Sequence, residues 1–456
     1  MTAHTSPPSP VTFSEALKFW FKLGCISFGG PAGQIAIMHR ELVEQKRWIS
    51  EKRFLHALNY CMLLPGPEAQ QLATYIGWLL HRTWGGVAAG ALFVLPSLFI
   101  LIGLSWVYVA FGAVPWVAGL LYGIKPAVAA LVVQAVHRIG SKTLKKPTTA
   151  PILWAIAATS FVALYMFAVP FPAIVLGAAL IGWLGAKVAP GQFRGGGGHG
   201  AAKAGELSHS PALIDDDTPT PPHARFRKMR LLQVLAVGAA LWLLPMAALV
   251  ANTGWHGTLA AMGWFFTKAA MLTFGGAYAV LPYVYQGAVA QFGWLTGTQM
   301  IDGLALGETT PGPLIMVVAF VGFVGGWTKE VLGPDALFLG AALAATVVTW
   351  FTFLPSFIFI LAGGPLIEST HGKLQFTAPL TAITAAVVGV IASLAIFFIA
   401  NIAIKTGASG PFLSNIDWAA LLLALAAGVA LIRFKVGVIK VIVLCALAGW
   451  VLKVWG

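Results

Sequence analysis

Charged side chains are scarce in this sequence of 456 residues. Asp, Glu, Lys and Arg together make up 9% of the chain, whereas hydrophobic residues make up 58%. Because soluble globular domains carry about 25% charged residues, this scarcity excludes an ordinary soluble domain. The mean hydropathy of +0.84 indicates the same class.

Cysteines are few and the common catalytic motifs are missing. The three cysteines, Cys25, Cys61 and Cys445, form no CxxC pair and indicate no disulfide framework. No pair of histidines has HExxH spacing, and no GxxxxGK[ST] loop for a nucleotide is present. We therefore expect no metal site, no cofactor, no ATP-driven cycle and no enzymatic activity.

Acidic residues are also few, since 15 Asp and Glu face 28 Lys and Arg and leave a net charge of +13. Such a charge could indicate nucleic-acid binding, but much of it lies in short loops between apolar runs, where it sets membrane topology. We therefore expect no nucleic-acid partner. The chain start lacks a basic segment followed by an apolar one, so it predicts no cleavable signal peptide.

Long uncharged apolar runs are abundant. Residues 84–110 form one run, and residues 147–186 form another that is long enough for two spans. A membrane-spanning helix needs about 20 mostly apolar residues. The sequence therefore predicts an all-α polytopic membrane protein, embedded in a lipid bilayer, with about 13 apolar segments.

Two motifs recur along the chain at one spacing. Ser27-Phe28-Gly29-Gly30 returns as Thr273-Phe274-Gly275-Gly276, and Pro65-Gly66-Pro67 returns as Pro311-Gly312-Pro313. Both pairs are 246 residues apart (273 − 27 and 311 − 65), as are Trp48 and Trp294. A constant long spacing of this kind indicates an internal duplication.

The duplication predicts the domain organisation. We expect a disordered tail at 1–12, a first transporter repeat at 13–187, a flexible linker rich in Gly, Pro and Asp at 188–226, and a second repeat at 227–456. The second repeat starts with an unmatched apolar run, 231–250. One extra crossing there would insert the second copy upside down relative to the first.

Charge favours the same arrangement. Residues 38–53 carry five Lys and Arg, whereas their counterparts 284–299 carry none. By the positive-inside rule the first loop is cytoplasmic and the second faces outside. We therefore predict two inverted repeats with broken, re-entrant helices and a cytoplasmic linker, an architecture found in many secondary transporters.

The glycine and proline motifs must interrupt helices at membrane depth. Such backbone is tolerated only where it is buried in protein or lines a cavity. The half-helix N-termini would present free N–H groups to an anion, and Lys22 and Lys268 would add counter-charges. The predicted substrate-binding residues are Lys22, Ser27, Gly29, Gly30, Pro65, Gly66, Pro67, Gln70, Lys268, Thr273, Gly275, Gly276, Pro311, Gly312 and Pro313.

Several of these residues have simpler explanations. A Gly-Gly pair can serve close helix packing, and a lysine near the end of a span can extend to the headgroups. Glu68 and Glu308 flank the Pro-Gly-Pro motifs, where they could cap helices or couple transport to protons. His39 and Arg40 are either an interfacial positive cluster or a guard at the entrance. These alternatives stay open on the sequence.

The motifs resemble the signature of the chromate ion transporter family. The resemblance is carried by residues 19–40, FWFKLGCISFGGPAGQIAIMHR, and by residues 58–73, LNYCMLLPGPEAQQLA. It implies efflux of chromate, a tetrahedral dianion shaped like sulfate, across a bacterial inner membrane, and thereby chromate resistance. The second copy departs from the pattern, because it lacks a proline after Gly276 and has Glu308-Thr309-Thr310 before its break.

Two other classes of function stay open. One is an importer of sulfate or another oxyanion on the same scaffold. The other is an intramembrane enzyme, which is disfavoured because no nucleophile–base pair recurs. The sequence also leaves open whether copies of the chain associate into a homo-oligomer.

The topology can be tested by labelling. We predict that residues 40–52 face the cytoplasm and residues 284–299 face outside. Single cysteines would be placed in each loop of a protein that lacks the native thiols, and treated with a membrane-impermeant reagent. Labelling of both loops from the same side would contradict inverted repeats.

Overall fold

The computed structural model describes residues 9–28, 30–112, 114–144, 146–193, 211–219, 221–274, 276–369, 377–404 and 415–455. Within these ranges the chain is almost entirely helical, and its only β-type contacts are two isolated bridges. The main helices are α1 (Phe13–Ile26), α2 (Gly30–His39), α3 (Glu51–Cys61), α4 (Glu68–Phe111), α5 (Pro115–Thr143), α6 (Pro151–Tyr165), α7 (Phe171–Val188), α9 (Lys228–Thr253), α10 (Thr258–Leu272), α11 (Ala277–Tyr285), α12 (Gly297–Thr309), α13 (Val317–Thr328), α14 (Leu337–Ser369), α15 (Thr377–Ala403), α16 (Trp418–Ile432) and α17 (Val438–Trp455). Short helical segments, α8 (Pro190–Phe193) and η1–η5, complete the described elements.

Six helical stretches in the described ranges are long and apolar enough to cross a membrane. They are Glu68–Phe111, Pro115–Thr143, Phe171–Val188, Lys228–Thr253, Pro334–Glu368 and Ala378–Ala403. Three shorter apolar helices accompany them: Pro151–Tyr165, Leu314–Thr328 and Trp418–Ile432. The all-α, polytopic class is thereby confirmed, whereas the count of about 13 segments is not.

Both predicted kinds of helix break are present. The chain breaks between α1 and α2 and between α3 and α4, and again between α10 and α11 and after α12. Each break contains a glycine with positive φ: Gly30 (+71°), Gly66 (+123°), Gly276 (+100°) and Gly312 (+107°). Residues with a side chain rarely adopt a positive φ, so the backbone conformation explains why each break contains a glycine.

The first copy folds into hairpins whose open ends lie together. The ring of Phe13, at the start of α1, lies 5.5 Å from the ring of His81, and the end of α2 returns to α3 through His39 and Glu51. The long helix α4 bends sharply at His81 and Arg82, where the backbone leaves the helical region. Residues 83–111 of α4 therefore run back past the breaks toward the opposite end of the molecule.

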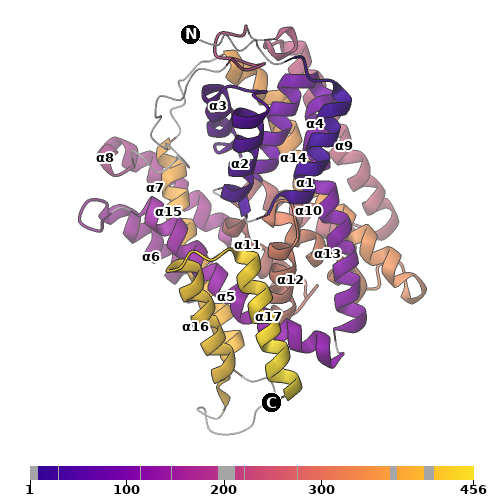
Figure 1. The fold of residues 1–456 in the computed structure, drawn as a ribbon, viewed down its shortest axis with the longest axis vertical. Coiled ribbons are helices and arrows are strands. Elements are labelled where there is room, and N and C mark those ends of the chain that lie inside the picture. The colour runs from indigo at the N-terminus through magenta and orange to yellow at the C-terminus, as the bar shows by residue number, and fades with distance from the viewer. Residues whose placement is uncertain are drawn as a thin grey trace, which may run out of the picture.

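Helices α4 and α14 pack together (Figure 1). Beyond its bend at His81 and Arg82, α4 runs in the opposite direction to α14. Midway along α4, Ser97 lies against Gly312, and near its end Tyr108 bonds to Asp302 of α12. Midway along α14, Ser356 lies against Gly66. Near the end of α14, Glu368 pairs with Arg53 of α3. The breaks thus lie in the middle of the molecule, and α3 and α12 begin at opposite ends.

The unmatched run predicted at 231–250 forms part of helix α9. This helix packs against α14 and α10 at the edge of the molecule. Much of its surface is exposed, with Leu232 at 60% and Leu244 at 70%. Exposed leucines on a helix of this length are expected where the neighbour is lipid.

Residues 211–219 of the predicted linker are docked on the first copy. Ile214 forms a bridge with Ile49, with backbone bonds of 2.9 Å from Ser50 N to Ile214 O and 3.1 Å from Ile214 N to Trp48 O. Ser50 Oγ donates to Asp216 at 2.6 Å. We name residues 211–219 the strap.

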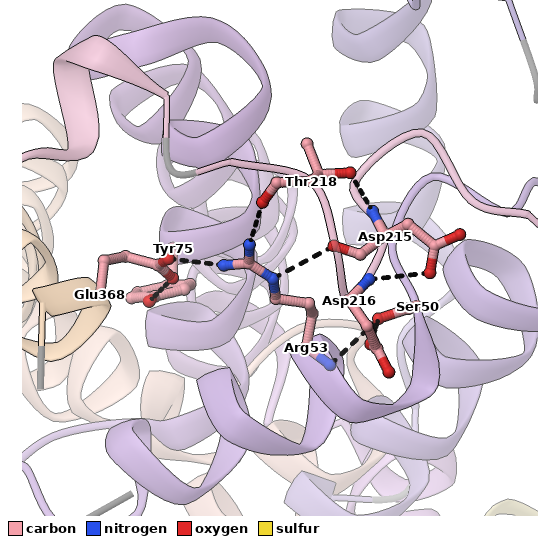
Figure 2. A network of polar contacts seen from close by, with 7 residues as sticks. All are labelled: Ser50, Arg53, Tyr75, Asp215, Asp216, Thr218 and Glu368. Carbon is pink, nitrogen blue, oxygen red and sulfur yellow. Dashed lines mark hydrogen bonds and ion pairs between the residues drawn. The ribbon is translucent and has the colours of Figure 1, made fainter. Parts of the chain in front are cut away.

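Arg53 lies beneath the strap and connects it to α14 (Figure 2). Its guanidinium donates to Thr218 O at 2.6 Å and to Glu368 at 2.7 Å, and Tyr75 donates to the same carboxylate at 2.5 Å. Farther along the linker, His223 Nε2 lies 2.9 Å from Trp78 O, and burial lowers the pKa of this histidine. Within the segment predicted as a flexible linker, 188–226, the strap thus makes backbone and side-chain bonds to the start of α3.

Removing the Arg53 side chain should destabilise the protein strongly. The Arg53–Glu368 pair is buried, with side chains 12% and 2% exposed, and loss of one partner of such a pair costs about 3–5 kcal/mol. The matched control is Lys52→Ala, whose ion pair with Asp216 is 3.8 Å long and whose side chain is 82% exposed. We expect Arg53→Ala to lower the unfolding temperature in detergent by several degrees and Lys52→Ala to leave it nearly unchanged. Equal changes of the unfolding temperature in the two variants would contradict a stabilising buried ion pair between Arg53 and Glu368.

Candidate functional site

The breaks of the two copies bond to each other. Gly66 N–H donates to Thr273 O at 2.8 Å, and Gly312 N–H donates to Ser27 O at 2.7 Å. The two donors are 246 residues apart (312 − 66), as are the two acceptors (273 − 27). The Pro-Gly-Pro break of each copy is therefore bound to the glycine-rich break of the other. We name this arrangement the junction.

The composition of Pro-Gly-Pro explains why this bond matters. Proline has no backbone N–H, so the central glycine supplies the only backbone donor of the motif. A buried donor without a partner costs free energy comparable to a lost hydrogen bond. Each break therefore satisfies the donor of the other copy.

Close approach also requires glycine at the junction. A Cβ at Gly66 would lie 2.3 Å from Ser356 Oγ, and a Cβ at Gly312 would lie 2.7 Å from Ser97 Cβ. The two serines stand in matching tripeptides, Leu95-Pro96-Ser97 and Leu354-Pro355-Ser356. Sequence reasoning missed them because their spacing is 259 residues (356 − 97) and not 246.

Glutamines reinforce the junction from the first copy alone. Gln34 Nε2 donates to Gly312 O at 2.5 Å, and Gln71 Nε2 donates to Pro65 O at 2.7 Å. The positions 246 residues later are Val280 and Val317. The predicted Gln70 is fully buried one position before Gln71, and its Nε2 donates to Thr74 Oγ1 at 3.0 Å.

Unfilled space lies between the two glycine-rich breaks. Gly30 is buried, yet a Cβ built on it would meet no atom of the described residues within 4 Å. A Cβ at Gly276 would meet Pro31 Cγ alone, at 3.9 Å. Helices α2 and α11 begin beside this space, where the first N–H groups of a helix have no partner within the helix. In α11 the N–H of Ala279 already donates to Gly276 O, and Pro31 of α2 has no N–H.

The hydroxyl groups beside the space differ between the copies. Ser27 Oγ is buried without a hydrogen-bond partner, whereas Thr273 Oγ1 donates to Ala269 O at 2.7 Å. Ser27 is therefore the available side-chain donor of the pair. The predicted Gly29 and Gly275 lie outside the described residues.

Two buried carboxyl groups flank the junction. Glu68 opens α4 directly after Pro67 and is 5% exposed, and Glu308 is 6% exposed before Pro311. Tyr278 donates to Glu308, and the guanidinium of Arg138 lies 5.9 Å from the centre of the Tyr278 ring. The structure thus brings both predicted carboxyls to the breaks.

The predicted lysines do not join them. Lys22 and Lys268 are exposed on α1 and α10, and Lys268 Nζ lies 5.6 Å from the centre of the Trp264 ring. Lys22 shares the uncovered face of α1 with Phe21 and Ile26. Their placement matches the simpler explanation, a lysine that extends along the surface toward the headgroups.

His39 and Arg40 lie at the open end of the first hairpin. His39 contacts Glu44 at 3.1 Å and Glu51, and Arg40 lies 3.6 Å from Glu41. They belong to a surface network of ion pairs there, away from the junction. Among the described residues, no group of three or more His, Cys, Asp or Glu could hold a metal ion.

Comparison with known families fits this geometry. The chromate transporter profile matches residues 14–183 and 260–450, in two blocks whose starts also differ by 246 (260 − 14). The chain belongs to the chromate transporter family. The family match leaves out residues 184–259, which contain the strap and all of α9.

Curated members of the chromate transporter family align with most of the chain. A chromate transport protein of Pseudomonas aeruginosa is 32% identical over 97% of this chain and 93% of its own length. A chromate transport protein of Cupriavidus metallidurans is 29% identical over 86% and 83%. A probable chromate transport protein of Synechococcus elongatus is 28% identical over 79% and 78%. No solved structure matches the chain.

A single methyl group should disrupt the junction. Gly312→Ala adds a Cβ that collides with Ser97, whereas Gly333→Ala, at φ +85°, adds one in open space. Both variants carry the cost of positive φ, which is about 1–2 kcal/mol for an alanine. We expect Gly312→Ala to abolish chromate flux in proteoliposomes and Gly333→Ala to retain it. Equal chromate flux by the two variants at matched protein levels would show that transport does not require close contact between Gly312 and Ser97.

Proposed function

We propose that this protein carries chromate out of the cytoplasm across the bacterial inner membrane, and that the junction is its substrate site. Membership of the chromate transporter family supports the substrate. The observation that carries the site is the reciprocal pair of bonds, Gly66 to Thr273 and Gly312 to Ser27, beside the space at Gly30. Irregular backbone that surrounds space at this depth is suited to binding.

We further infer that the two copies are inverted repeats with re-entrant hairpins. The opposite directions of α4 and α14 support this, as does the extra helix α9 between the copies. In this arrangement the tips of both sets of hairpins reach the middle of the bilayer. The half-helix N-termini of α2 and α11 then approach the same depth from opposite sides.

Charge supports a cytoplasmic strap. The strap binds at the end of the molecule that carries the basic loop 38–53, through Ser50, Lys52 and Arg53. Basic residues mark the cytoplasmic side. The opposite end contains residues 284–299, which have no Lys or Arg.

Recognition of the anion relies on neutral donors in this account. Free N–H groups at helix starts carry partial positive charge and bind tetrahedral oxyanions such as phosphate and sulfate. Ser27 Oγ would add a hydroxyl donor. Glu68 and Glu308 stay our candidates for proton coupling at the junction, because both carboxyls are buried beside the breaks.

The membrane potential alone can drive export of a dianion. Moving one charge through 100 mV is worth about 2.3 kcal/mol, so an inside-negative membrane favours exit of two charges by about 4–5 kcal/mol. Since about 1.4 kcal/mol corresponds to tenfold, this supports a gradient of about a thousandfold. Import of the same dianion would require a coupled ion.

The direct test is flux from proteoliposomes that contain chromate. We expect an inside-negative potential, imposed by a potassium gradient and valinomycin, to accelerate chromate exit without any pH gradient. Liposomes with the Gly312→Ala protein are the matched control for leakage. If chromate exit required a pH gradient and did not respond to the potential, export driven by the potential alone would be contradicted.

The alternative substrate is sulfate, which has the same shape and charge. Competition separates the two, because a sulfate transporter would lose chromate flux when sulfate is present at equal concentration. We expect chromate flux to persist under that condition. Proton-driven uptake of labelled sulfate would instead favour an oxyanion importer.

A further inference from the structure

A polar cavity of about 420 Å³ lies at the end of the molecule opposite the strap. It is enclosed by the end of α4, the start of α5, the start of α12 and the end of α13. Its lining residues are Tyr108, Val109, Gly112, Ala118, Leu121, Lys125, Thr298, Gln299, Asp302, Val324, Trp327 and Thr328. None of these was predicted as a site residue from the sequence.

One buried carboxylate in this cavity is incompletely satisfied. Asp302 is 2% exposed, and its Oδ2 accepts from Tyr108 OH at 2.9 Å and lies 3.6 Å from Lys125 Nζ. Its Oδ1 is buried and has no hydrogen-bond partner among the described residues. An ionised carboxylate carries about four acceptor positions, so a partner is missing on this side.

The remaining polar groups of the cavity are donors. The Lys125 side chain is 25% exposed, so water reaches it, and an ammonium group has three N–H donors. Gln299 Oε1 already accepts from Thr296 N at 2.8 Å, which leaves the Gln299 NH₂ group available. Thr298 adds a hydroxyl to the lining. This donor set suits an oxyanion, and Asp302 is the group that opposes it.

We propose that the cavity is a second binding station for the transported oxyanion, which Lys125 holds only when Asp302 is protonated. An ionised Asp302 occupies Lys125 as its counter-ion and repels a dianion. A proton taken from the outside water neutralises Asp302 and frees Lys125 for the anion. When Asp302 returns this proton to the same side, the anion is released. The proposal rests on the chromate-transport function above.

This station does not require protons to cross the membrane. Because the proton enters and leaves from one side, outside pH sets the release of chromate while the potential still drives its transfer. Acidic water outside would retain the anion, and alkaline water would release it.

Other charged groups near Asp302 are few. Lys125 of α5 acts on it through its charge, and Tyr108 of α4 acts on it through a hydrogen bond. On its own helix Glu308 is bound to Tyr278. The neighbouring helices α13 and α15 carry no titratable side chain in their described ranges, and Lys453 of α17 lies 5.6 Å from the Tyr122 ring.

The equivalent place in the first copy is built differently. The residue 246 positions before Asp302 is His56, and the one before Gln299 is Arg53. Arg53 is engaged by Glu368 and the strap, so an ion pair occupies the place that corresponds to Gln299. The station therefore belongs to the outer end of the second copy.

The test is chromate binding to the purified full-length protein in lipid nanodiscs, measured between about pH 6 and pH 8.5. We expect wild-type affinity to fall at least tenfold over this range. Asp302→Asn mimics the protonated acid, so it should bind tightly at both ends of the range and keep only the pH dependence that comes from chromate itself. Lys125→Met should bind at least tenfold more weakly at about pH 6, and Lys125→Arg should restore binding.

A third variant tests the titration itself. Tyr108→Phe removes a hydrogen bond that favours the charged carboxylate, so tight binding should persist to a higher pH than in the wild type. This shift distinguishes titration of Asp302 from a merely structural role. It also keeps the proposal testable where Asp302→Asn fails to fold.

Matched controls are Asp335→Asn and Lys440→Met, which remove exposed charges outside the cavity and should follow the wild-type curve. Chromate itself gains a proton as the pH falls toward about 6, and comparison with Asp302→Asn cancels this contribution. The same pH curve in wild type and Asp302→Asn, or wild-type binding by Lys125→Met, would overturn the station. Absence of chromate binding by every protein would instead remove the substrate assignment, and the station with it.

Discussion

The structure depends on the pairing of interrupted backbone between two copies of one motif. A Pro-Gly-Pro break at membrane depth has one backbone donor, and no water or lipid there can satisfy it. Gly66 and Gly312 solve this by donating to Thr273 and Ser27 of the opposite copy. The glycines, the serines packed on them and the opposed helices α4 and α14 all follow from the need to bring these backbones together.

The two ends of the molecule differ although the middle is nearly symmetric. At one end, Arg53 and Glu368 form a buried ion pair covered by the strap. At the other end, Lys125 and Asp302 form a longer pair beside a cavity. The proposals place the end with the Arg53–Glu368 pair in the cytoplasm and the cavity beside Asp302 outside.

The constant spacing identified backbone that is broken in both copies, and it put Gly66, Gly312, Ser27 and Thr273 among the predicted substrate-binding residues. It did not predict that these breaks bond to each other. Their binding of substrate stays a prediction. The same spacing also repeats residues on the outer faces of helices, which is why Lys22 and Lys268 match in sequence and yet both lie exposed. Repetition alone does not reveal which face of a helix is buried.

Three other features were missed for separate physical reasons. Ser97 and Ser356 are 13 positions out of the common register (259 − 246), because the second copy is longer between α13 and α14 than the first is at the bend of α4. The strap reads as a polar linker, since its single buried isoleucine, Ile214, gives no periodic pattern. Asp302 has no acidic counterpart in the first copy.

The measurement that tests the proposed substrate site most directly is anomalous scattering from chromium in crystals of the protein with chromate. We expect an anion beside Gly30, Gly276 and Ser27. An anion located away from these residues, with the junction empty, would contradict the junction as the substrate site.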